Sequence, residues 1–162
     1  MTSIIKVDQI QTAAGGVPTA ADLGLNVSGS VVQTVTAQNS TNVNAAQQSA
    51  WVQCFSFQIH NVTAGNSVTI EVSPSGLMEH AGTVLVGVFK GSQELGRSVQ
   101  HSNGNGGWRT APVTIMVTDT NPTSGTNTYD IKFYSTNAYC YINYPLSGFN
   151  GVTHCKMQEI AG

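Results

Sequence analysis

Side chains that branch at Cβ dominate this chain and restrict the folds open to it. Its 162 residues include 18 Val, 9 Ile and 18 Thr, but only 6 Leu. A β-branched side chain loses rotational freedom in a helix, whereas it packs well on the pleated surface of a sheet. The sequence therefore predicts an all-β fold.

Apolar segments separated by turn residues set the number of strands. About eight or nine strands are predicted, roughly 8 to 15 residues apart. They cover residues 29–38, 51–59, 68–72, 83–89, 93–100, 113–117, 129–133, 139–144 and 152–160. Such spacing is typical of sandwiches and barrels. We expect residues 30–162 to form a jelly-roll-like antiparallel β-sandwich.

Two of these segments allow predictions about individual faces and turns. Alternation in the second strand places Trp51 on the same face as Phe55, Phe57 and Ile59. Residues 83–89 are apolar throughout, which is typical of a strand buried on both faces. Gly91 and Ser92 follow and predict a tight hairpin.

The segments between the strands are rich in small polar residues. Residues 39–50 read as a loop, although residues 43–52 could support one helical turn. Residues 102–107 carry the strongest turn signal of the chain, with the Asn-Gly chemistry that type I′ hairpins require.

Residues 1–29 differ from the rest and predict an extended anchoring arm. Short apolar pieces alternate there with Gly, Pro and small polar residues, and none is long enough to bury itself. Such a segment becomes ordered by packing against sister copies or a larger particle. The side chains expected to anchor the arm are apolar: Ile4, Val7, Ile10, Val17, Leu23 and Leu25.

Charge is scarce, and this argues against several functions. Lys and Arg total 6, Asp and Glu total 8, and the formal net charge is -2. A nucleic-acid binder or an electrostatically bound membrane protein needs clustered Lys and Arg. No apolar run approaches the length of a membrane span, and no secretory signal is recognisable, so we expect synthesis in a cytoplasm. Ser, Thr, Asn and Gln supply 57 of the 162 residues, which suits a durable assembly or a sugar-contacting surface.

The sequence predicts neither a catalytic site nor a cofactor. The four histidines, His60, His80, His101 and His154, have no metal-ligand spacing among themselves or with the cysteines. The acidic residues away from the termini are scattered, and each is expected to be solvated: Glu71, Glu79, Glu94, Asp119 and Asp130. No catalytic motif is present, so we expect a non-enzyme.

Three cysteines, Cys54, Cys140 and Cys155, form an odd set. Free buried thiols are the favoured interpretation in a reducing cytosol. One disulfide, or Cys54 near Cys155 across the sandwich, remains an alternative.

The most ligand-like local group flanks the glycine-rich turn. It consists of His101, Asn103, Trp108 and Arg109. An exposed Trp can stack on a sugar ring while neighbouring polar groups bond its hydroxyls. The competing interpretation is that Trp108 closes one end of the sandwich core, which is favoured because large aromatic side chains are mostly buried.

Both ends of the chain resemble a known family. Residues 5–10 (IKVDQI), 12–16 (TAAGG) and 29–33 (GSVVQ) resemble the start of fibre-type virion proteins of tailed bacteriophages. Residues 153–162 (THCKMQEIAG) are similar to the closing strand of the small β-sandwich domain in that family. The resemblance implies a homotrimer in the virion, with the arm docked on other virion proteins and the sandwich displayed toward a host glycan or protein.

One departure from the family keeps two other functions open. Family fibres often have a long shaft, and this chain has none. A short form could instead be a decoration or cement protein that clamps neighbouring capsid subunits. A third hypothesis, from a different class, is a carbohydrate-binding module of a bacterial enzyme system.

Overall fold

The computed structural model describes residues 27–46, 50–75, 78–80, 82–102, 108–110, 113–135, 139–143 and 151–162. Every regular element in these ranges is a β-strand. None of them contains a helix that could cross a membrane. The prediction of an all-β fold is confirmed.

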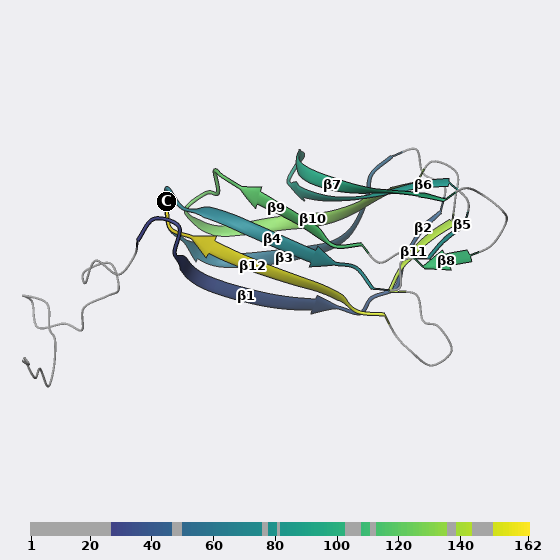
Figure 1. Cartoon of the computed structure of the whole chain (residues 1–162), viewed down its shortest axis with the longest axis horizontal. Helices are drawn as coiled ribbons and strands as arrows, with labels where there is room; N and C mark the ends of the chain where they lie inside the picture. Colours follow the sequence, from purple (N-terminus) through teal and green to yellow (C-terminus); the bar gives the residue numbers. More distant parts are fainter. Residues whose placement is uncertain are drawn as a thin grey trace, which may run out of the picture.

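Eight long strands form two four-stranded antiparallel sheets, which face each other (Figure 1). The first sheet has the order β1 (Val31–Asn39), β12 (Thr153–Ile160), β4 (Ser67–Ser73) and β9 (Ile115–Asp119). The second sheet has the order β3 (Val52–Val62), β10 (Gly125–Ser135), β6 (Gly82–Lys90) and β7 (Gln93–Ser102).

The order of these strands is that of a jelly roll. Counted along the chain, the first, eighth, third and sixth long strands make the first sheet. The second, seventh, fourth and fifth make the second sheet. The chain thus crosses between sheets at almost every connection, as in the two Greek keys of a jelly roll. The jelly-roll-like sandwich predicted from sequence is therefore confirmed.

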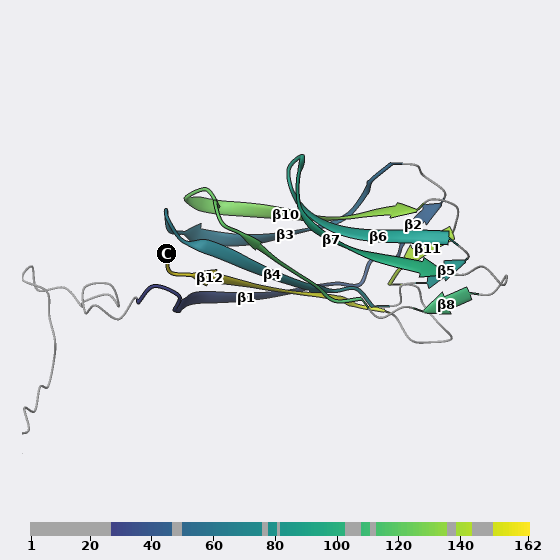
Figure 2. The ribbon, with the colours of Figure 1, turned by 45° about the horizontal axis from the view of Figure 1, so that its top comes forward.

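A third, small sheet lies at one end of the sandwich (Figure 2). It has the order β2 (Val43–Ala46), β11 (Tyr139–Ile142), β5 (Met78–His80) and β8 (Trp108–Thr110). Each strand sits in a connection that crosses between the two large sheets. Across the small sheet, these connections follow the same order as the strands that they join in the two large sheets. The C-terminus and the start of β1 lie at the opposite end (Figure 1).

The small sheet overturns two sequence expectations. Residues 43–46 form strand β2, where a loop or a helical turn was expected. Pairing with β11 decides this, since a short segment of weak propensity follows its tertiary neighbours. Residues 102–107 do not connect the two strands of a hairpin, because β7 pairs with β6 and β8 pairs with β5.

Alternating side chains of the two large sheets form one core. The first sheet contributes Val68, Ile70, Val72, Ile115, Cys155 and Met157, and the second contributes Phe55, Phe57, Ile59, Val84, Val86, Val88, Tyr129, Ile131 and Phe133. The β6–β7 hairpin predicted at Gly91 is also confirmed, and Gly91 adopts a φ of 60° there.

A β-bulge at Cys54 moves Trp51 to the outer face of the second sheet. Phe55 pairs with Ile131 and Gln53 with Lys132, so Cys54 is the extra residue. One inserted residue reverses which side chains point inward. The prediction that Trp51 shares a face with Phe55 is therefore wrong.

Candidate binding surfaces

A fully buried carboxylate ties three parts of the chain together at the end where β1 begins and the C-terminus lies. Glu159 of β12 is 0% exposed. Its carboxylate accepts hydrogen bonds from Gln33 Nε2 at 2.6 Å, from the Thr63 amide at 2.7 Å and from Asn66 Nδ2 at 2.6 Å. These donors come from β1 and from the β3–β4 turn. Glu159 thus joins the start of β1, that turn and the C-terminal strand into one unit.

The same hydrogen bonds determine the charge of Glu159. Burial acts to raise the pKa of the Glu159 carboxyl, but the Thr63 amide and the side-chain amides of Gln33 and Asn66 outweigh it. The pKa of Glu159 therefore lies below its ordinary value, and the group is a carboxylate at neutral pH. No sequence pattern indicated this role, because its three donors lie 93 to 126 residues away.

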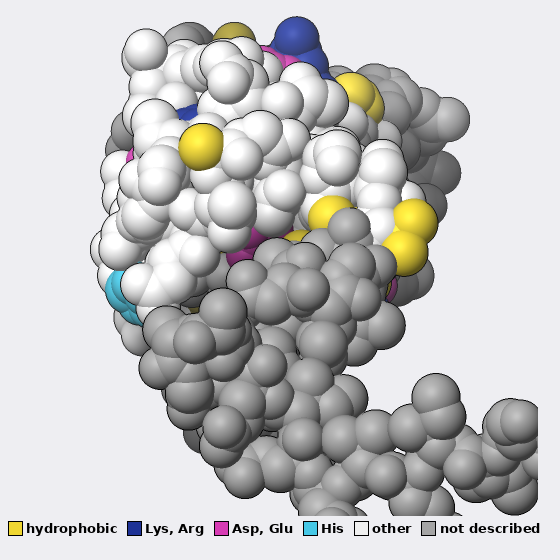
Figure 3. Space-filling view, turned by 90° about the vertical axis from the view of Figure 1, so that its left-hand side faces the viewer, with side chains coloured by type: hydrophobic (Ala, Val, Ile, Leu, Met, Phe, Trp, Pro, Cys, Tyr) yellow, Lys and Arg dark blue, Asp and Glu magenta, His cyan; other side chains and the backbone are white. Residues whose placement is uncertain are grey.

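Backbone bonds fix the first described residues to the same unit. Gly29 N donates to Ala161 O at 2.8 Å, Ala161 N donates to Ser30 O at 2.9 Å, and Ser30 N donates to Val27 O at 2.9 Å. The chain therefore enters β1 from a fixed position beside the C-terminus. Figure 3 views the molecule from this end, where scattered hydrophobic side chains lie on a largely uncharged surface.

A second buried carboxylate, Asp119, corrects the expectation that the acidic residues are solvated. Asp119 is 5% exposed, and it accepts hydrogen bonds from Lys90 Nζ at 2.8 Å and from the buried Tyr129 hydroxyl at 3.0 Å. The amide of Asn121 donates to it as well, at 3.0 Å. Burial opposes ionisation, yet Lys90 and these donors lower the pKa of Asp119 below its ordinary value. Asp119 secures the ends of β6 and β9 against β10.

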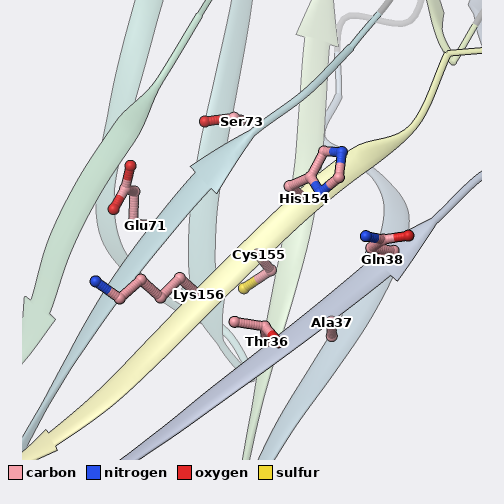
Figure 4. Close-up of a pocket in the computed structure, with 8 residues that line it drawn as sticks. All are labelled: Thr36, Ala37, Gln38, Glu71, Ser73, His154, Cys155 and Lys156. Carbon is pink, nitrogen blue, oxygen red and sulfur yellow. The ribbon is translucent and has the colours of Figure 1, made fainter.

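The outer face of the first sheet carries a shallow polar groove of about 160 Å³ (Figure 4). Strands β1, β12 and β4 line it, and their register aligns Thr36, Lys156 and Glu71 in one row. His154 is exposed and lies two residues before Lys156, whereas Cys155 between them is buried. Within the described ranges, no side-chain hydrogen bond or ion pair joins His154, Lys156 or Glu71 to another residue.

The chemistry of this groove suits binding better than catalysis. Burial raises the pKa of the Cys155 thiol to about 12, so it stays protonated and is a weak nucleophile. His154 has no hydrogen-bonded orienting partner among the described residues, as a general base normally has. The exposed His154 and Lys156 and the half-buried Glu71 offer hydrogen bonds and charges to a polar partner. In the described part of the chain, no group of three or more His, Cys, Asp or Glu residues is arranged to hold a metal ion.

An aromatic cluster covers part of the outer face of the second sheet. The Trp51 ring contacts Phe89 edge-on at 4.9 Å between centroids and lies 5.9 Å from Tyr134. Lys132 Nζ sits 4.5 Å from the centre of the Phe89 ring. Gly87 makes room for the cluster, since a Cβ there would lie 2.7 Å from Phe89 and 3.1 Å from Trp51. The aromatic cluster covers the outer face of β6 and the core covers its inner face, as predicted for residues 83–89.

The ligand-like group predicted from sequence falls at the small-sheet end. His101 is in β7 and pairs with Thr83, while Trp108 and Arg109 are in β8 and pair with His80 and Glu79. Asn103 lies outside the described residues, and only the backbone of the other three is described. The backbone thus brings three of the four to the same end of the molecule, on two different sheets. The six arm residues, Ile4, Val7, Ile10, Val17, Leu23 and Leu25, lie outside the described residues.

Cys54 is half-buried, Cys140 and Cys155 are buried, and none of the three forms a disulfide in the structure. Burial, with the nearby Cys140 as a second cause, raises the pKa of Cys54 to about 12. The alternative of one disulfide is therefore not realised.

Comparison with known proteins identifies no family for this chain. No protein-family model and no curated protein matches it. Among solved structures, it aligns with a structure of infectious bursal disease virus Gx strain at 12% identity and a TM-score of 0.39, covering 82% of this chain and 39% of that chain. It aligns with the VP2 subviral particle of infectious bursal disease virus at 13% identity and a TM-score of 0.35, with the same coverage of 82% and 39%. The chain spans well under half the length of both. A TM-score below 0.5 does not establish a common fold, so the jelly roll rests on the strand order alone.

Proposed function

We propose that this chain is a structural virion protein that is assembled in the host cytoplasm. In this proposal the arm of residues 1–29 docks on other virion proteins. The sandwich of residues 30–162 projects outward as a homotrimer and contacts a host-surface glycan or protein. No catalysis or cofactor is part of the proposal.

The observation that carries the proposal is the difference between the two ends of the jelly roll. The described chain begins at one end, beside the C-terminus, where Glu159 and the backbone bonds of Gly29 hold the start of β1. The four connections that bear the small sheet lie at the opposite end (Figure 1). Docking through the arm leaves that second end, with His101, Trp108 and Arg109 on its strands, free to meet another surface.

Two further features support the same function. The outer face of the first sheet is polar, with few charges, as suits a protein exposed on a durable particle. The resemblance of residues 5–10 and 153–162 to fibre-type virion proteins of tailed bacteriophages supports arm docking and a trimer. Because Gly29 and Ser30 are hydrogen-bonded to Ala161, an arm docked on the particle would also fix the position of the sandwich.

A cement protein is the second candidate, and one observation favours it. Residues 27–30 form a turn that leads directly into β1, so no shaft separates the predicted arm from the sandwich. A domain held this close to the particle could clamp neighbouring capsid subunits. Purified particles that lack a cement protein should rupture earlier on heating or chelation than particles that contain it. Unchanged rupture would favour the fibre.

The arm hypothesis is tested with charge substitutions in the full chain. The triple variant Ile4→Asp, Val7→Asp, Ile10→Asp removes three apolar anchors. The matched control Thr2→Asp, Gln9→Asp, Gln11→Asp adds the same charge at polar positions. We expect the first to be incorporated into particles at least about tenfold less than the second, since each buried apolar side chain contributes on the order of 1.5 to 3 kcal/mol. Equal incorporation of the two variants would overturn docking through the arm. A free chain that binds sugar and never joins a particle would overturn the virion function.

A further inference from the structure

The free edge of β1 is the strongest remaining candidate for an interaction surface. β1 is the outermost strand of the first sheet and pairs only with β12 among the described strands. In an antiparallel pair, every second residue directs its N–H and C=O away from the partner strand. A nine-residue edge of this kind is a template for another strand.

The β1 side differs from the other side of the sandwich, where the edge strands β9 and β7 lie close together. There β7 and β9 approach each other so tightly that a Cβ on Gly96 would lie 2.6 Å from Val117 Cγ1. On the β1 side, β3 has little to gain from a cover, because its inward side chains, such as Phe57 at 5% and Ile59 at 0%, are already buried. The inward side chains Val35 and Ala37 of β1 are only partly buried, although they pack against the core.

Exposed apolar side chains also concentrate where β1 begins. The described residues include five exposed large hydrophobic side chains, and three of them are Val27 at 65%, Val31 at 52% and Val32 at 39%. All three lie within six residues of one another in the chain, at the point where β1 begins. These valines continue directly from the arm.

We propose that this edge receives residues 4–8 of the arm of a second copy, which pair with β1 as a fifth strand of the first sheet. The sequence of this segment fits the two faces of β1. Ile5 and Val7 would face inward and cover Val35 and Ala37, while Lys6 and Asp8 would join the polar outer face beside Thr34 and Thr36. A one-residue slip would put the polar pair inside, so the alternation selects one register.

The chain exit favours a neighbour's arm over the chain's own. The bonds of Gly29 and Ser30 to Ala161 hold the start of β1 on its β12 side, away from the free edge. The described chain then leads away from the sandwich (Figure 1). An arm passed from each copy to the next closes into a ring, which is the arrangement a trimer requires. This inference rests on the homotrimer of the proposed function, and it identifies the strand pairing through which the copies associate.

Hydrogen–deuterium exchange on the full-length protein tests it, with sedimentation in parallel. In the wild-type oligomer, the β1 amides that point away from β12 should exchange at least about tenfold more slowly than in the variant Ile5→Asp, Val7→Asp. That variant should sediment as a monomer with unchanged protection in β12 and β4, which shows that it folds. The control Thr2→Asp, Gln11→Asp carries the same charge outside the segment and should behave as wild type.

The remaining outcomes separate this inference from the proposed function. Equal β1 exchange in wild type and variant would overturn strand addition. If the arm still directs incorporation into particles, the virion function stands without it. A wild-type monomer with protected β1 amides would mean that the chain pairs with its own arm, and would overturn the inference as well.

Discussion

Glu159 and Asp119 are buried carboxylates that the fold keeps charged. Each is taken out of water, and each is compensated by hydrogen-bond donors, with the Lys90 ammonium added for Asp119. A buried charge without such partners would be strongly unfavourable. Residues of this kind therefore hold segments together only as long as the whole set of donors is in place.

The first prediction concerns the hydrogen bonds of Glu159. Glu159→Gln keeps the shape of the side chain but replaces one acceptor oxygen with a donor that faces other donors. We expect the free energy of unfolding to fall by about 1 to 3 kcal/mol. Urea denaturation measures this. Glu71→Gln is the control, because Glu71 makes no side-chain bond among the described residues, and an equal loss in both variants would contradict the role of Glu159.

The second prediction concerns acid stability. The folded pKa of Glu159 lies below its ordinary value of 4.5, so its ionisation favours the folded state above that pH. This stabilisation is lost as the pH falls from about 4.5 through the lower folded pKa, because the unfolded chain then binds more protons. Urea midpoints measured from pH 7 to pH 3 should therefore drop more steeply for the wild type than for Glu159→Gln. Parallel curves would show that folding does not lower the pKa of Glu159.

At the scale of elements, Gly96 allows β7 and β9 to approach each other closely at one side of the sandwich. The inward position of Gly96 leaves room for Val117 of the other sheet. Side chains fill protein cores as densely as organic crystals, so one added methyl group at such a point displaces its neighbours. The third prediction follows from this close approach.

Gly96→Ala should lower the free energy of unfolding by about 1 to 3 kcal/mol, because its methyl group overlaps Val117. Adding Val117→Ala removes the overlap, so the double variant should be more stable than the sum of the single changes predicts, by about 0.5 kcal/mol or more. A double-mutant cycle from urea titrations measures the coupling. Strict additivity would mean that another contact limits the approach of the sheets.

Elements also differ in how far sequence could predict them. The long strands follow from alternation and from β-branched residues, as Ile131 and Phe133 illustrate, since a strand with one buried face must alternate. The bulge at Cys54 could not be predicted, because it depends on the pairing with β10. Strand β2 forms through its pairing with β11. Glu159 was missed because local sequence contains no signal of donors 93 or more residues away.

At the scale of the whole molecule, the jelly roll is a spacer with two unlike ends. Its longest strands, β3 and β10, have 11 residues each. At about 3.3 Å per residue they span roughly 36 Å. The C-terminus lies at the end where β1 begins, whereas β7 ends and β8 begins at the small-sheet end (Figure 2).

This geometry predicts where labels will be found on an assembled particle. A small tag fused after Gly162 should lie next to the docking surface, whereas the same tag inserted between Ser102 and Trp108 should lie about 35 Å or more farther out. Particle-bound density at modest resolution can measure both radial positions. Incorporation equal to that of the untagged chain is the control for folding. If both tags lay at the same radius, the sandwich would lie flat on the particle, which is the orientation expected of a clamp between subunits and not of a displayed fibre tip.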